Sequence, residues 1–272
     1  MIVRNLIFSS LIFLISFGAH AVPKEQSKKK IIMAVFAHPD DEAGTNVTPL
    51  LAKYAREGHN VYLVFATKGE LGVAKHANIP AGEPLALTRA AEAACACEHL
   101  GIKPPILLGL GDGSLSKTFT GRPLHEKLDS LFRTYNPDIV ITWGPDGGYG
   151  HMDHRIVHDI VTELVQSGQL SKPNQLYYSG IPTENWKQTP NFKTQVRKIV
   201  ENWNTVKKEY LTVRIKCTPE DTEKSIAAMY CHKSQYTTEQ LDDIKLWMLN
   251  TNRDTVYLRP FKAQEKIIYR LF

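Results

Sequence analysis

The 272-residue sequence lacks several patterns that would assign it to a familiar class of protein. No serine stands in a GxSxG turn, which excludes the nucleophile elbow of α/β-hydrolases. The four cysteines form no CxxC pair, which excludes a zinc knuckle. The alternate glycines of residues 109–113 lack the GxGxxG spacing of a dinucleotide loop. We interpret them as a loop that needs the backbone angles open to glycine.

An apolar run long enough to span a membrane comfortably is also missing. Residues 6–17 are apolar apart from three serines, whereas a transmembrane helix needs roughly 20 residues. A basic start precedes this run, small residues two apart follow at 19–21, and no cysteine stands at a lipoprotein position. We therefore expect residues 1–21 to be a cleaved signal peptide and the protein to be exported, either periplasmic or secreted. An uncleaved membrane anchor is the alternative interpretation.

The sequence has no long run of residues that carry charge of one sign. Lys and Arg number 33 against 28 Asp and Glu, a net charge of +5. The lysines are scattered apart from residues 28–30, which fall in an expected flexible tail over residues 22–30. Solvated charge explains this pattern better than nucleic-acid binding. We expect no nucleic-acid partner, and no stable membrane anchor after signal cleavage.

The few cysteines leave disulfide pairing open. Cys95 and Cys97 are two apart in a helical stretch, so they face different directions and are poor partners for each other. A bond between Cys217 and Cys231 is one arrangement, and buried free thiols are the other. Export would place the chain where disulfides form.

Apolar runs that alternate with helical patterns fill the rest of the chain. The predicted strands are residues 31–36, 61–66, 106–108, 139–143, 176–179, 210–217 and 256–258. The predicted helices are one that ends near residue 56 and those over residues 85–100, 124–135, 151–165, 218–232 and 238–249. Residues 182–208 fit neither pattern. This order predicts an α/β sandwich with a mostly parallel sheet, formed by a single domain over residues 31–272.

Two charged clusters each follow an apolar run. Residues 37–42 read AHPDDE, and residues 150–154 read GHMDH. Four ionisable side chains at the end of a buried strand are costly unless a metal or a partner compensates them. Because ligand crevices of open α/β sheets lie at the carboxyl ends of strands, we expect the two clusters to meet over one metal ion.

The spacing inside each cluster suits metal ligation. His38 and Asp41 are three apart at a strand-to-helix junction, where both can point into one crevice. His151 and His154 are three apart on the first turn of a helix and share a face. A catalytic zinc ion has three such ligands and an open position for water. A lone histidine would more often be a surface or core residue, but two clusters together favour the metal.

The remaining polar residues supply candidates for the chemistry. Asp40 is the predicted general base, taking the proton of a zinc-activated water as it attacks a carbonyl. His151 is predicted to stabilise the oxyanion or to protonate the leaving amine. Asp153 could orient a histidine, with a helix-dipole carboxylate as an equal alternative. Tyr149 could also reach the oxyanion, with a structural tyrosine as the alternative.

With these residues identified, the sequence resembles the PIG-L/LmbE family of zinc-dependent N-deacetylases. The two clusters carry the resemblance, and Met152 stands where the family often has proline. Weaker motifs in the family's order extend it through residues 31–235 and lie at residues 67–70, 89–92, 100–101, 108–113, 136–138 and 232–235. The resemblance implies a Rossmann-like three-layer α/β sandwich without a dinucleotide.

The resemblance also implies roles for site residues. It places Zn²⁺ on His38, Asp41 and His154. It assigns Asp40 as the base and His151 as its electrostatic or acid partner. It further suggests that Arg89 and Asp112 contact polar groups of the substrate, with a helix salt bridge and a turn-forming aspartate as the respective alternatives.

The reaction implied is removal of an N-acetyl group from an N-acetylglucosamine-type amino sugar or glycoconjugate. A metal-dependent amidase or esterase acting on a non-sugar acyl substrate is one alternative, and a non-catalytic sugar-binding module is another. A site of two histidines and one aspartate also accepts other divalent metals. No pattern encodes the substrate, the acyl group, the oligomeric state or a role for residues 236–272.

Overall fold

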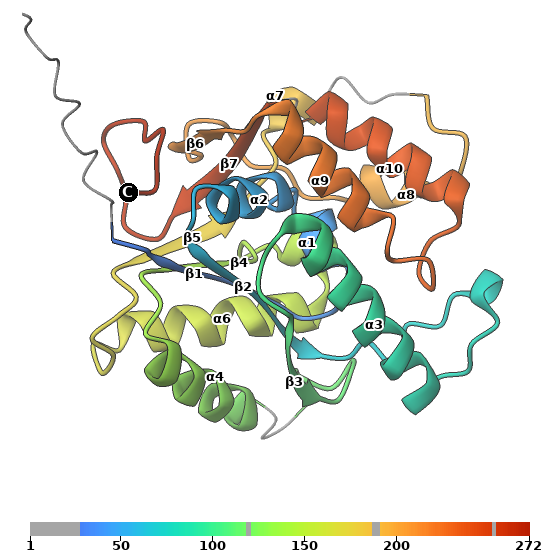
Figure 1. The fold of residues 1–272 in the computed structure, drawn as a ribbon, viewed down its shortest axis with the longest axis horizontal. Helices are drawn as coiled ribbons and strands as arrows, with labels where there is room; N and C mark the ends of the chain where they lie inside the picture. The colour runs from blue at the N-terminus through green and yellow to red at the C-terminus, as the bar shows by residue number, and fades with distance from the viewer. Residues whose placement is uncertain (1–27, 118–120, 187–190, 252–253) are drawn as a thin grey trace, which may run out of the picture.

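A seven-stranded sheet lies at the centre of the computed structural model, which describes residues 28–117, 121–186, 191–251 and 254–272 (Figure 1). The strand order is β3-β2-β1-β4-β5-β7-β6. The first five pair in parallel, and β7 runs antiparallel to both of its neighbours. The strands are β1 (Ile31–Phe36), β2 (Asn60–Thr67), β3 (Ile106–Leu110), β4 (Ile139–Thr142), β5 (Gln175–Ser179), β6 (Val213–Lys216) and β7 (Thr255–Pro260).

Helices cover both faces of the sheet, which confirms the predicted three-layer α/β sandwich. On one face pack α2 (Thr48–Arg56), α3 (Glu83–Leu100) and α9 (Pro219–Met229). On the other lie α4 (Gly121–Tyr135) and α6 (Met152–Gln166). The central strand β1 feeds both cores in turn, since successive side chains of a strand point to opposite faces. Ile32 and Phe36 enter one core, and Met33 and Val35 enter the other.

A third apolar cluster lies beside the sandwich and consists mostly of residues from the last third of the chain. It joins α8 (Val196–Glu201) and α10 (Thr238–Thr251) around the buried Trp247. Ala43 of α1 (Asp41–Gly44) belongs to the same cluster, so this unit reaches the first charged motif. The short elements are α5 (Gly147–Gly150), α7 (Thr183–Trp186) and η1 (Lys75–Ala77).

The first predicted helix is divided in two. Between α1 and α2, Asn46 adopts a φ of 57°, in the left-handed region that breaks a right-handed helix. Pro49 then stands in the first turn of α2, where its missing N–H costs nothing. The break gives the charged motif a short helix of its own directly after β1.

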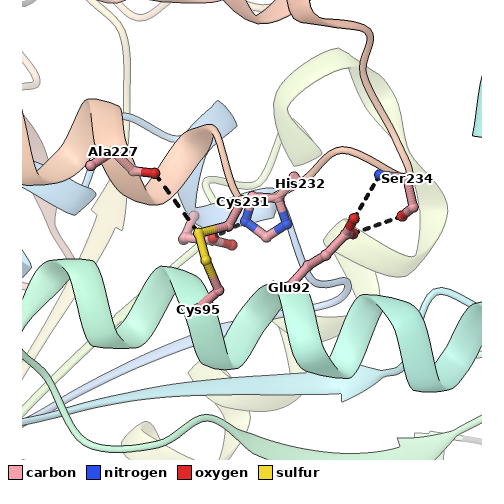
Figure 2. Close-up of a disulfide and its surroundings, with 7 residues drawn as sticks. Glu92, Cys95, Ala227, Cys231, His232 and Ser234 are labelled. Atoms are coloured by element: carbon pink, nitrogen blue, oxygen red, sulfur yellow. Dashed lines mark hydrogen bonds and ion pairs between the residues drawn. A yellow bond between two sulfur atoms is a disulfide. The ribbon is translucent and has the colours of Figure 1, made fainter.

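The structure contains a disulfide between Cys95 of α3 and Cys231, just after α9 (Figure 2). The Cα atoms of the two residues are 5.9 Å apart. Cys97 and Cys217 are buried free thiols. Of the two arrangements left open by the sequence, Cys217–Cys231 does not form, because the packing of α3 on α9 brings Cys95 to Cys231, and buried free thiols hold for Cys97 and Cys217 only.

Two predictions concern segments that the described residues do not test. The expected signal peptide, residues 1–21, lies outside them, and so does most of the expected tail over residues 22–30. Among the residues described, no helix is both long and apolar enough to cross a membrane.

Candidate active site

The two charged clusters meet at the carboxyl ends of β1 and β4. These strands are neighbours, with Val35 opposite Thr142, so the segments that follow them leave the sheet side by side. A cleft of about 600 Å³ opens at this point. Its walls include residues of both clusters and, from elsewhere in the chain, residues 71–72, 89, 112–113, 198–199, 202–203 and 235–236.

The side chains of the three predicted metal ligands meet in this cleft. His38 Nδ1 lies 3.2 Å from His154 Nε2, which in turn lies 3.2 Å from Asp41 Oδ1. His38 Nδ1 approaches the other oxygen of this carboxylate, Asp41 Oδ2, at 3.6 Å. Ligand atoms about 2.0–2.1 Å from a tetrahedral zinc ion are roughly 3.3 Å from one another. The two contacts of His154 Nε2 have this spacing, so these side chains form a candidate site for such an ion.

Hydrogen bonds and stacking aim Asp41 and His154 at this point. Asp41 Oδ2 accepts two backbone N–H groups of its own loop, at 2.9 and 2.8 Å, and the indole N–H of Trp143 at 3.2 Å. His154 stacks on Trp143 with ring centroids 4.0 Å apart, and its Nδ1 lies 3.0 Å from the carbonyl oxygen of Gly147. That carbonyl places the proton on Nδ1 and leaves the Nε2 lone pair for a metal.

Two carboxylates face the other nitrogen of His38. Its Nε2 lies 3.1 Å from Asp112 Oδ1 and 3.4 Å from Asp153 Oδ2, within ion-pair distance but outside hydrogen-bond geometry. Asp153 is buried, accepts the backbone N–H groups of Gly113 and Leu115, and is not a wall of the cleft. Asp153 is a candidate for the chemistry through the orientation of a histidine, and its contacts support that role, because it stands behind His38.

Two carboxylates of the site, those of Asp41 and Asp112, remain ionised at neutral pH. Burial raises the pKa of Asp41, but the imidazoles of His154 and His38 lower it well below its usual range. Burial also raises the pKa of Asp112, and His38 more than offsets this, so that the pKa is about 2. A divalent cation would balance this negative charge. Asp112 lines the cleft, so its predicted contact with substrate stays a prediction.

Asp40 lines the cleft in a backbone conformation that few residues adopt. Its φ is 115°, in the region that favours glycine, and such strain persists only where the surroundings enforce it. Oδ1 accepts from Arg89 Nη2 at 2.8 Å, and Oδ2 accepts from the Tyr236 hydroxyl at 3.3 Å. Burial raises the pKa of Asp40, and Arg89 opposes this only in part. A raised carboxyl pKa suits a general base.

Arg89 also lines the cleft, so its predicted contact with substrate stays a prediction, and its observed contacts are within the chain. It is buried on α3, where its guanidinium binds Asp40 and donates to the carbonyl oxygens of Gly69, at 3.0 Å, and Pro39. The salt-bridge alternative is the one these contacts support. Its partner, however, comes from the β1–α1 loop rather than from the same helix.

His151 and Tyr149 both face the cleft. The Nδ1 atom of His151 accepts the backbone N–H of Asp153 at 3.2 Å, which places the imidazole proton on Nε2. Burial and the imidazoles of His154 and His38 lower the pKa of His151, so it is a neutral N–H donor at pH 7. Burial raises the pKa of Tyr149, whose ring centroid lies 5.9 Å from that of His151. Its hydroxyl therefore stays protonated as a second donor.

Sequence reasoning missed several residues of the site. Trp143 and Trp203 line the cleft, and Trp203 lies in the stretch that fitted no pattern. Tyr236 touches Asp40, and His232 donates from Nε2 to Glu42 at 2.7 Å. The weak family motif at residues 232–235 was the signal for this segment. The motif alone assigns no role, because the sequence does not show which residues its side chains contact.

Comparison with known proteins agrees with this geometry. The family model described as PIG-L, GlcNAc-PI de-N-acetylase, matches residues 33–165. The 1D-myo-inositol 2-acetamido-2-deoxy-alpha-D-glucopyranoside deacetylase of Mycobacteroides abscessus is 35% identical over 173 residues, which cover 56% of this chain and 61% of that protein. The enzyme of the same name from Corynebacterium urealyticum is 29% identical over 254 residues, 80% of this chain and 72% of its own. The chain thus spans about three fifths of the first relative's length.

Solved structures share the fold at low sequence identity. N,N'-diacetylchitobiose deacetylase from Pyrococcus horikoshii has a TM-score of 0.66 and 18% identity, covering 85% of this chain and 84% of that one. GalB, a 4-carboxy-2-hydroxymuconate hydratase from Pseudomonas putida, has a TM-score of 0.59 and 15% identity, covering 86% and 97%. Since one neighbour is a deacetylase and the other a hydratase, the fold alone does not select the reaction. The family match does bear on it: residues 33–165, just under half of the chain, are similar to the PIG-L family.

Proposed function

We propose that the protein is a metal-dependent N-deacetylase that removes the acetyl group from an N-acetylglucosamine-type amino sugar or glycoconjugate. The observation that carries the proposal is that the side chains of His38, Asp41 and His154 meet in the same cleft that the carboxylate of Asp40 lines. The names of the relatives from Mycobacteroides abscessus and Corynebacterium urealyticum support the same substrate class.

His38, Asp41 and His154 would hold the metal, and their donor set suits zinc. A bound zinc ion supplies Lewis-acid chemistry, polarising a carbonyl and making water a nucleophile at neutral pH. The chain's own contribution is to keep the three donor atoms in place. Trp143, through its indole N–H and its ring, contacts two of the three ligand side chains.

Asp40 and His151 move and hold protons in this proposal. Asp40 takes the proton of the attacking water and later delivers one to the leaving amine, which its raised pKa favours. Arg89 and Tyr236 fix one carboxylate oxygen each. His151 Nε2–H donates to the oxyanion as charge develops on the acetyl oxygen.

The cleft suits a sugar bearing hydroxyl groups. Aromatic rings of Trp203 and Tyr149 line it together with polar side chains of Asp112, Asn202 and Gln235. Aromatic faces pack against the apolar face of a sugar ring, and a few placed polar groups orient it.

Acetate release tests the proposal. Metal-loaded protein is expected to release acetate from at least one N-acetylglucosamine-containing compound, and chelator should abolish release until zinc is restored. A panel with non-sugar amides and acetate esters separates the proposed reaction from the amidase and esterase alternatives. If metal-loaded protein released acetate from no substrate in the panel, the deacetylase proposal would fail.

We also propose export to the periplasm or the medium. The Cys95–Cys231 disulfide supports this, because structural disulfides persist in oxidising compartments. Cell fractionation, with mass determination of the mature N-terminus, tests it. A cytosolic protein that retains residues 1–21 would contradict export.

A further inference from the structure

The turn directly after α9, residues 231–236, approaches the site from the far end of the chain. We propose that this 231–236 segment is a positioning element for Asp40, and that the Cys95–Cys231 disulfide holds it in place. The inference rests on the proposed function only for its kinetic consequence. Its structural part stands on the contacts of the segment.

Two side chains of the segment reach Asp40 by separate routes. His232 is buried, and its Nε2 donates to Glu42 Oε1 at 2.7 Å. The other oxygen of Glu42 accepts the backbone N–H of Asp40 at 3.1 Å. Tyr236 donates its hydroxyl directly to Asp40 Oδ2 at 3.3 Å. The segment therefore restrains both the strained backbone and the carboxylate of the proposed base.

The segment is itself anchored to α3 at two points that flank His232. The disulfide fixes Cys231 to Cys95, and Glu92 accepts the backbone N–H and the hydroxyl of Ser234 at 2.6 and 2.7 Å (Figure 2). Residues 92 and 95 are three apart on α3, so they share one face of the helix. A helix packed into the core thus supplies a rigid mount for the turn.

The same face of α3 also acts on Asp40 directly. Arg89, three residues before Glu92, binds Asp40 Oδ1 at 2.8 Å. One helix therefore fixes the first carboxylate oxygen through its own side chain, and the second through the 231–236 segment. Loss of the disulfide would leave Arg89 bound to Asp40 and would loosen the contacts that Tyr236 and His232 make on the other side of Asp40.

Reduction of the disulfide is the direct perturbation. A small dithiol transfers two electrons and two protons: the Cys95–Cys231 bond breaks, each sulfur gains a hydrogen, and the dithiol closes to its cyclic disulfide. Because a misplaced catalytic group loses rate rather than substrate affinity, we expect kcat to fall about ten- to a hundredfold with KM little changed.

The test compares the oxidised wild type, the Cys95→Ser/Cys231→Ser double variant and a Cys217→Ser control that removes a thiol outside this network. Hydrogen exchange of the amides in residues 40–44 and 231–236 is measured in each metal-loaded protein, together with kcat, KM and bound zinc. Tyr236→Phe, which loses only a hydroxyl, provides a variant expected to fold normally. Glu92→Gln against Glu92→Ala tests rescue of the second anchor, since Gln keeps one acceptor.

The proposal expects faster exchange in both stretches and a lower kcat in the double variant, with zinc content and KM unchanged and Cys217→Ser like wild type. Tyr236→Phe should lower kcat in the same direction, and Glu92→Gln should retain more rate than Glu92→Ala. Exchange and kcat equal to those of wild type in the double variant would overturn it. If the wild type proved inactive on every substrate, the amide exchange of residues 40–44 would still decide whether the disulfide controls the position of Asp40.

Discussion

Asp40 is the residue on which the proposed chemistry depends most. Arg89 and Tyr236 hold its two oxygens in the cleft. Since general-base catalysis typically contributes a factor of about 10² to 10⁴, we expect Asp40→Asn to lower kcat by that amount. KM and bound zinc should change little, and steady-state kinetics with metal analysis check all three. Unchanged turnover would remove Asp40 from the mechanism.

Asp153 offers a second prediction at this scale. Its carboxylate stands 3.4 Å behind His38 Nε2. Because partners that orient a ligand tune metal affinity, Asp153→Asn should weaken zinc binding about 10- to 100-fold, as measured by competition with a chromophoric chelator. Asp159→Asn, an exposed aspartate on the same helix, is the matched control. Equal zinc affinity in the two variants would argue against the orienting role.

Single residues differ in how far sequence can assign them. That His38, Asp41 and His154 meet was predictable, because histidine and aspartate at this spacing, directly after buried strands, are typical of metal ligands. Arg89 was not, because its partner lies in a loop 49 residues away along the chain. Tyr236 carried no signal either, since its hydroxyl acquires meaning only beside Asp40.

At the scale of elements, Asp221 links α9 to α2. It shares a capping box with Thr218 at the start of α9 and accepts two hydrogen bonds from the Arg56 guanidinium, each 3.0 Å long. Burial raises the pKa of Asp221, and the bonds from Arg56 and Thr218 more than offset this, so the folded-state pKa lies below the usual value. Asp221→Asn should lower the free energy of unfolding by about 2 kcal/mol at pH 7, as urea denaturation would measure.

The pH dependence of that loss follows from the sign of the shift. A carboxyl group whose pKa is depressed in the folded state contributes its full stabilisation at pH values above its unfolded-state pKa of about 3.9. That contribution is lost as the pH falls through the folded-state pKa. The gap between wild type and Asp221→Asn should therefore shrink below about pH 4. Glu220→Gln, which alters an exposed neighbour, should change stability by less than about 0.5 kcal/mol. A gap that grew on acidification would contradict the assignment.

Elements with strong periodicity were predictable, and short ones were not. Strands β1, β2 and β4 appear where continuous apolar runs predicted them. The division into α1 and α2 was missed because Asn46 at positive φ is a local conformation that the apolar spacing of the helix does not reveal. Helices α7 and α8 were also missed, since four and six residues are too few to show a period.

The whole molecule should be more stable with its metal than without it. An ion that binds the folded chain and not the unfolded one adds about 2.7 kcal/mol at a hundred times its Kd. Chelation should therefore lower the Tm, and restoring zinc should recover it. Scanning calorimetry with His154→Ala as the control checks this, because that variant should respond far less to chelator. An equal response in both proteins would contradict a metal held by His154.

The global arrangement was predictable in outline and not in its long-range pairings. Alternating strands and helices predicted the three layers, and the strand ends predicted where the site lies. The Cys95–Cys231 bond could not be derived, because it depends on how α3 packs against α9 rather than on any sequence pattern. The same holds for the 231–236 segment, which reaches Asp40 across nearly two hundred residues of chain.

The central claim is that His38, Asp41 and His154 hold one metal ion in the cleft. Anomalous diffraction at the zinc edge, from crystals of zinc-loaded protein, tests it most directly. We predict a single strong peak about 2.0–2.2 Å from His38 Nδ1, an Asp41 oxygen and His154 Nε2. A peak on the opposite side of His38, between Asp112 and Asp153, or no peak in the cleft at all, would contradict the account.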